Sequence, residues 1–217
     1  MKIRNTLELD ASIDQDIAWR KREFTTLKFL ISGSKNHEKN VLLRSAIVLL
    51  YSHWEGHIKH CALVYLNYLN HKGYSYEQLK ENFLLLSLNE KFSKGFSIKK
   101  FPSQKEIYDY FRNPRHESFR INEDLVIDTD SNLKYEIVLN ILKQLGLDDK
   151  IYELKQNFID SKLIRCRNHI AHGEFIPITD VTDTYNELEL ELLNMIQLFQ
   201  NLIKNAVSTK DYLKKTS

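Results

Sequence analysis

Apolar side chains recur every three or four positions along most of this chain, a spacing that is typical of amphipathic α-helices. The longest such stretch covers residues 38–71, and Gly73 follows it at a position where helices often end. Its first half is apolar on more than one side, which indicates a central helix of a bundle. The same spacing predicts helices over 13–31, 75–88, 103–112, 132–145 and 180–207, and one helix or two, joined near Asp160–Ser161, over 149–172.

Polar residues that favour helix N-termini stand before several of these stretches, and a proline follows one of them. Side-chain oxygens at such positions accept hydrogen bonds from the first backbone N–H groups, whereas proline ends a helix before it. The candidates are Asp10 or Ser12 for the first helix, Asp130 or Ser131 for 132–145, Thr179 or Asp180 for the last, and Pro114 as the terminator of 103–112.

The helical pattern is weakest over residues 89–130, where lysines alternate with aromatic residues. This composition suits either a contact with single-stranded RNA or a solvated insertion anchored by its rings. The stretch lacks an apolar pattern large enough for a second core, so we expect an insertion on one domain covering 1–217. With only 6 glycines and 3 prolines, the chain is expected to form an all-α bundle rather than a sandwich or barrel.

The remaining composition excludes several classes of protein. A formal charge of +2 argues against a protein that coats nucleic acid over its whole surface. Cys61 and Cys166 lie inside helical patterns, so a disulfide framework is not expected. The N-terminus lacks an apolar leader and no stretch is long and apolar enough to cross a membrane. We therefore expect a cytoplasmic protein.

Polar residues gather in one short segment, Arg165-Cys-Arg-Asn-His-Ile-Ala-His172, which is followed by Gly173 and Glu174. The glycine stands where a left-handed residue closes a helix. Two arginines, an asparagine and histidines within two turns favour a site over a packing stripe, since histidine titrates near neutral pH. A polar helix end, stabilised by its dipole, is the simpler interpretation.

A second histidine group lies on the long helix, where His53, His57 and His60 share one face. Such spacing is compatible with zinc. We expect no carboxylate or cysteine beside them on that face, which favours a half-buried polar face or a dimer seam and leaves a metal-dependent hydrolase as a weaker hypothesis. Glu55 is expected either to pair with Lys59 or to reach the motif helix and hold an arginine.

The segment Arg167-Asn-His-Ile-Ala-His172 resembles the signature of the HEPN superfamily, in which an arginine and a polar residue precede a histidine. Arg167 and His172 have four residues between them, and Arg165 and His172 have six. Tyr51-Ser-His-Trp-Glu-Gly-His-Ile-Lys59 is similar to the corresponding helix of a prokaryotic branch. The insertion at 89–130 is outside this resemblance.

The resemblance implies a homodimeric endoribonuclease that needs no metal or other cofactor and acts as a toxin, with an antitoxin protein as a possible partner, or as an anti-phage effector. His172 would transfer protons, Arg167 would hold the phosphate, and Asn168 would orient His172 or the phosphate. Arg165, His169 and Glu55 are accessory candidates for RNA contact. A non-catalytic helical module that binds a protein or a nucleotide is the alternative.

Helix geometry complicates a site on one helix. At about 100° per residue, Arg167 and His172 point about 140° apart, whereas Arg165, Asn168 and His172 fall within about 60°. Three arrangements remain open: the helix loosens at Ala171–His172, two protomers combine their residues, or Arg165 is the phosphate arginine.

Overall fold

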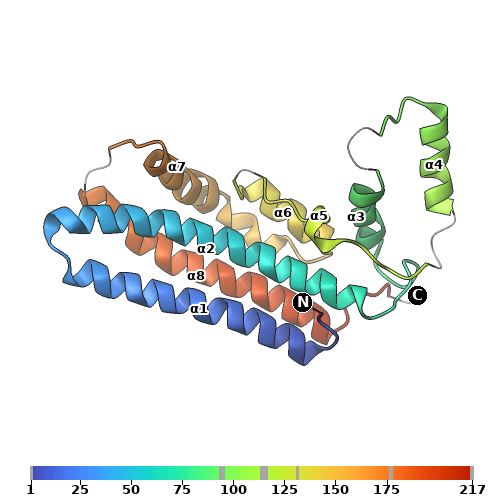
Figure 1. Ribbon diagram of the computed structural model, residues 1–217, viewed down its shortest axis with the longest axis horizontal. Helices are drawn as coiled ribbons and strands as arrows, with labels where there is room; N and C mark the ends of the chain where they lie inside the picture. The colour runs from blue at the N-terminus through green and yellow to red at the C-terminus, as the bar shows by residue number, and fades with distance from the viewer. Residues whose placement is uncertain (1, 93–95, 113–116, 131, 176–177, 216–217) are drawn as a thin grey trace.

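Three long helices form the body of the molecule, as the computed structural model shows for residues 2–92, 96–112, 117–130, 132–175 and 178–215. They are α1 (Thr6–Gly33), α2 (Asn36–Asn70) and α8 (Ile178–Ser208). Helix α2 packs against both others, and it runs antiparallel to α1 and parallel to α8 (Figure 1). The expectation of a central helix at 38–71 is confirmed.

Shorter elements form a second layer on the side of α2 that faces away from α1 (Figure 1). They are α3 (Glu81–Lys91), α5 (Glu123–Val126), α6 (Tyr135–Gln144), the 3₁₀ segment η2 (Lys150–Lys155), the π-helical segment η3 (Asn157–Ile164) and α7 (Arg165–Ala171). Trp54 of α2 is fully buried between the layers and lies 6.3 Å from the Tyr152 ring. The Tyr152 hydroxyl donates to the Met195 carbonyl of α8.

The predicted all-α bundle with an irregular insertion is confirmed. The described residues contain no strand, only isolated bridges between Ser75 and Ser118 and between Leu79 and Leu213. None of the described helices has the length and apolarity of a membrane span.

Several predicted helix ends were wrong. Helix α1 begins at Thr6, and the side chain of Asn5, rather than Asp10 or Ser12, accepts from the Glu8 N–H. Residues 75–79 form bridges and turns instead of helix, so α3 starts only at Glu81.

Helix α6 also begins later than predicted, at Tyr135, whose N–H donates to Asp160 Oδ1 of η3. The predicted joint at Asp160–Ser161 is not a break, because both residues lie inside the π-helical segment η3. The region before α7 is 3₁₀-helical at η2 and π-helical at η3 instead of α-helical. Pro114, Ser131 and the side chain of Thr179 lie outside the described residues.

The insertion contains an element that stands away from the bundle, helix α4 (Phe101–Arg112) (Figure 1). No residue of α4 is buried. By contrast, Phe119 and Ile121, later in the insertion, are buried in the core. The insertion thus contributes to the core through its C-terminal part, whereas α4 stays outside the core.

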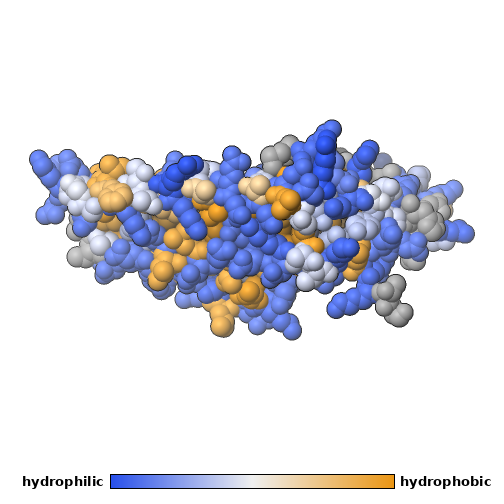
Figure 2. All heavy atoms as spheres, turned by 90° about the horizontal axis from the view of Figure 1, so that it is seen from below, coloured by the Kyte–Doolittle hydropathy of each residue, from blue (hydrophilic) through white to orange (hydrophobic). Residues whose placement is uncertain are grey.

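An apolar patch lies at the turn between α1 and α2, where Phe29, Leu30 and Val41 are exposed. They line an open groove of about 660 Å³. Figure 2 shows apolar side chains gathered at this end of the molecule, on its left. Most of the face seen in that view is hydrophilic, as expected for a surface of the bundle.

Candidate functional site

The motif segment forms the last turns of a helix, as the sequence predicted. Helix α7 continues directly from η3, and i→i+5 hydrogen bonding of the η3 type is frequent at functional sites. Gly173 has a φ of +77°. The N–H of Gly173 donates to the Ile170 carbonyl and that of Glu174 to the His169 carbonyl, the two bonds of a Schellman ending. The Arg44 side chain of α2 donates to the Glu174 carbonyl and holds this ending against the bundle.

Arg167 is half-buried and held by neutral groups on three sides. Its NH1 nitrogen donates to Oδ1 of Asn132 and to Oδ1 of Asn168, at 2.8 Å each. Its Cζ lies 4.7 Å from the centre of the Tyr51 ring, a cation–π contact. Among the described residues, no carboxylate forms an ion pair with Arg167. The guanidinium is therefore fixed in place by neutral groups.

Tyr51 of α2 lies beneath Arg167, and Glu55 follows Tyr51 by one turn on the same helix. The Tyr51 hydroxyl accepts from the Leu133 N–H at 2.7 Å and bonds the Glu55 carboxylate. Burial raises the pKa of Tyr51 to about 12; the Leu133 N–H opposes this rise and Glu55 adds to it. The phenol therefore stays neutral and donates to Glu55, and none of the ion pairs among the described residues joins Glu55 to an arginine.

His172 is exposed at the end of α7, in the C-cap position. Helix α7 keeps α-helical geometry through Ala171, so Arg167 and His172 remain about 140° apart. Asn168 bonds Arg167 instead of His172. The structure thus brings Arg167 and Asn168 together beside Tyr51 and leaves His172 separate.

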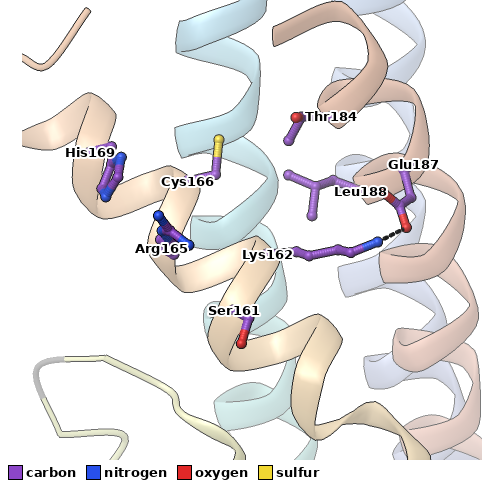
Figure 3. A pocket seen from close by; sticks show the side chains of 8 residues that line it. All are labelled: Ser161, Lys162, Arg165, Cys166, His169, Thr184, Glu187 and Leu188. Carbon is purple, nitrogen blue, oxygen red and sulfur yellow. Dashed lines mark hydrogen bonds and ion pairs between the residues drawn. The ribbon is translucent and has the colours of Figure 1, made fainter. Parts of the chain in front are cut away.

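Arg165 and His169 lie on another face of α7, toward α8. They line an open cavity of about 310 Å³ with Cys166 (Figure 3). Its other lining residues are Ser161, Lys162, Thr184, Glu187 and Leu188. Lys162 is ion-paired with Glu187 across the cavity, and His169 Nδ1 lies 3.2 Å from Glu174 Oε2. Burial raises the pKa of the Cys166 thiol, which argues against a reactive thiolate here.

The histidines of α2 belong to a polar network against α1, and the expectation of no nearby carboxylate or cysteine was wrong. His57 Nδ1 is hydrogen-bonded to Asp16 Oδ2 of α1, and its Nε2 lies 3.3 Å from Cys61 Sγ. Arg20 donates to both oxygens of Asp16 and to the His53 carbonyl. The Asp16 and Arg20 side chains are only 10% and 8% exposed.

The protonation states of its groups indicate that this network has a structural role rather than a catalytic one. Burial lowers the pKa of His57 and raises that of Cys61. Burial also opposes ionisation of Asp16, but hydrogen bonds from His57 and Arg20 outweigh it and lower the pKa of Asp16. Asp16, His57 and Cys61 form a row like that of a thiol enzyme, yet Cys61 is fully buried and protonated. Among the described residues, no His, Cys, Asp or Glu group is arranged to hold a metal ion.

Sequence reasoning missed Tyr51 and Asn132 at the site, and Asp16 and Arg20 in the network. Tyr51 lies one turn before Glu55, and such i,i+4 pairs face the same side of a helix. That spacing was a usable signal for Tyr51. The remaining three act across the fold, 33 to 41 residues away from their partners.

The structure is a bundle of long helices, and the end of α7, with Arg167, Asn168 and His172, packs against the central helix α2. These features are those of one class of helical domain. Residues 15–208 match the model of the family RiboL-PSP-HEPN, and the chain belongs to this HEPN family. No curated protein matches the chain, and no solved structure does.

Proposed function

We propose that this protein is an endoribonuclease that cleaves RNA without a metal ion. In such a reaction the ribose 2′-oxygen attacks phosphorus and loses its proton to a base. The bond to the 5′-oxygen breaks, and that oxygen gains a proton from an acid. Family membership and the residues at the end of α7 support the proposal.

The observation that carries it is the state of Arg167. Two asparagine oxygens and an aromatic ring hold the guanidinium, and none of these groups neutralises it. Arginine binds phosphate through charge-assisted, often bidentate hydrogen bonds. NH2 and Nε of Arg167 have no hydrogen-bond partner among the described residues and would provide these donors. A fixed donor of this kind stabilises the charge that develops on the phosphate oxygens.

His172 would supply the proton transfers. Its exposed position at the helix end leaves its ring accessible to a bound strand, and general acid–base catalysis contributes about 10²–10⁴-fold. Because Arg167 and His172 of one helix point apart, we propose that a homodimer combines Arg167 of one protomer with the partner's His172. Arg165 and His169, on the other face of α7, would contact the RNA.

Cleavage of a fluorescent single-stranded RNA tests the proposal. Wild type is expected to cleave in excess chelator and to leave 2′,3′-cyclic phosphate ends, and His172→Ala is expected to cleave about 10²–10⁴-fold more slowly. His71→Ala is the matched control, because it removes an exposed histidine at the end of α2 that has no proposed role in binding or proton transfer. Wild type without cleavage, or His172→Ala with full activity, would refute the proposal.

A second candidate is a non-catalytic module that binds a protein or a nucleotide. The observation that favours it is that both hydrogens of Arg167 NH1 are used inside the chain, as in a purely structural arginine. Under this candidate wild type and His172→Ala would be equally harmless when expressed in bacteria.

We further propose a biological role for the nuclease in the cytoplasm, as a single domain over 1–217 that acts as a toxin with an antitoxin partner, or in anti-phage defence. Expression of wild type should then arrest growth, and His172→Ala should not. Growth arrest that His172→Ala preserves would contradict this role.

A further inference from the structure

Helix α4 is amphipathic, yet none of its residues is buried and it stands apart from the bundle (Figure 1). One side of α4 is anchored: the Tyr110 hydroxyl hydrogen-bonds Ser87 of α3, and the Tyr110 ring contacts the Phe92 ring edge-on at 5.6 Å. The helix therefore has a defined inner side at Tyr110. Its opposite side faces solvent.

The outer side carries an alternating row of aromatic and basic residues, which we call the α4 stripe: Phe101, Lys105, Tyr108 and Arg112. Relative to Phe101, the other three point within about 40°, and Tyr110 points about 180° away. All four residues of the stripe are exposed, Phe101 to 75% and Tyr108 to 60%. The Arg112 guanidinium lies 5.9 Å from the centre of the Tyr108 ring.

Charge adds to this pattern. Residues 98–112 contain four basic and two acidic side chains, so this segment carries a net positive charge. The acidic residues, Asp109 and Glu106, point about 80° and 140° from Phe101 and lie beside or behind the stripe. None of the four stripe residues is ion-paired to a described carboxylate. An exposed, net positive row of this kind suits an anionic ligand with aromatic groups.

We infer that the α4 stripe binds single-stranded RNA, with Phe101 and Tyr108 stacking on bases and Lys105 and Arg112 contacting phosphates. Exposed rings interleaved with cations are the pattern by which proteins bind single strands without sequence preference. The two rings are about 10.5 Å apart along the helix axis. That is about three times the 3.4 Å step of one strand in a duplex, which leaves room for two stacked bases between the rings. Each ring can stack on a base only where the run of stacked bases is interrupted, which a single strand allows and a continuous duplex does not.

Other occupants fit the stripe less well. A helix that lies on a membrane separates an apolar face from a basic one, whereas here rings and cations alternate on one face. A two-fold contact of the stripe with the same stripe of a second copy would set cations against cations, because the stripe contains no acidic residue.

This inference rests on the proposed function for the choice of RNA, and it extends that function by separating substrate capture from cleavage. Helices α4 and α7 lie toward opposite ends of the molecule (Figure 1). An RNA long enough to reach from α4 to the motif would gain from the stripe, and a very short one would not. The stripe should therefore affect KM for long substrates and leave kcat unchanged.

Binding of a labelled, unstructured 30-nucleotide RNA to full-length protein tests the inference, with His172→Ala as the background so that cleavage does not interfere. Phe101→Ala and Tyr108→Ala should each weaken binding by about 5- to 150-fold, the range for loss of one stacked base. Lys105→Gln with Arg112→Gln should lower the slope of log K against log salt by about 1.4, for two contacts with a single strand.

Conservative variants separate these effects from loss of structure. Tyr108→Phe keeps the ring and Lys105→Arg keeps the charge, so both should bind like the background protein. Glu106→Gln, on the same helix but behind the stripe, should not weaken binding. Because the stripe residues are exposed, unfolding midpoints should stay unchanged.

Unchanged affinity in the two ring variants would overturn the inference, and so would equal binding of duplex and single strand. A shift from dimer to monomer in the ring variants, with unchanged RNA affinity, would assign the stripe to a second copy instead. RNA binding by the stripe in a protein that cleaves nothing would uphold this inference and refute the proposed nuclease. If the protein cleaves RNA but the stripe variants bind it as well as the background protein does, the proposed nuclease would be upheld and this inference refuted.

Discussion

Replacing Arg167 and Arg165 by alanine, one at a time, separates two arginines that the sequence could not rank. Arg167→Ala removes two hydrogen bonds and a cation–π contact. At about 1 kcal/mol for each bond and about 0.5–1 kcal/mol for the ring contact, the free energy of unfolding should fall by about 2.5–3 kcal/mol. Arg165 is exposed, so Arg165→Ala should change it by less than about 0.5 kcal/mol.

Arg167→Ala should also lose more cleavage activity than Arg165→Ala, but for another reason. Loss of a fixed donor to the developing phosphate charge costs about 10²–10³-fold in rate, so we expect this loss for Arg167→Ala under single-turnover conditions at 25 °C. Arg167→Lys keeps the charge but not the planar fork, and should fall between wild type and Arg167→Ala. Urea denaturation measured in parallel shows whether each variant is folded in the assay.

One result would refute this reasoning. If Arg165→Ala abolished cleavage while Arg167→Ala, still folded, retained it, Arg165 would be the phosphate arginine. Arg167 would then be only a structural link between α2 and α7. His172 would share a face with Arg165 on a single helix, and no partner would be needed to explain the site.

Three further predictions concern the polar network between α1 and α2. Asp16→Ala leaves the buried Arg20 without its carboxylate, so urea denaturation should show a loss of about 3–5 kcal/mol, partly recovered when Arg20→Leu is added; equal stability of Asp16→Ala and wild type would contradict this. A Cβ on Gly56 would lie 3.1 Å from Arg20 NH1, and Arg20 is pinned by Asp16, so Gly56→Ala should lower the melting temperature instead of giving the usual gain of about 1 kcal/mol. Burial lowers the pKa of His57 below its ordinary 6.5, so below pH 6.5 the unfolded chain binds a proton at His57 more readily than the folded chain does. The free energy of unfolding should therefore be highest above pH 6.5 and fall as the pH drops below this value. His57→Gln should flatten this decline.

The sequence predicted the long helices well because their apolar spacing persists over many turns. The interval 38–71 differs from the observed Asn36–Asn70 by only one or two residues at each end. Short elements were less predictable. Residues 75–79 have helical spacing, but bridges from Ser75 to Ser118 and from Leu79 to Leu213 replace the helix, and such pairings come from distant parts of the chain.

The candidate site shows the same limit. Glycine and polar residues at 165–174 correctly indicated a helix end with a left-handed closure at Gly173. The partners of Arg167 could not be read in advance, because Asn132 and Tyr51 come from other elements. The shared face of His53 and His57 was visible in the spacing, whereas the α1 carboxylate that explains their burial was not.

Mixing two inactive variants tests the central claim of a composite site most directly. In a dimer of Arg167→Ala with His172→Ala, a site built across the two-fold axis is doubly mutated on one side and intact on the other. Co-expressed variants should therefore recover about a quarter of wild-type cleavage, since about half of the dimers are mixed and each has one intact site of two. A mixture as inactive as either parent, beside an active wild type, would contradict the composite site.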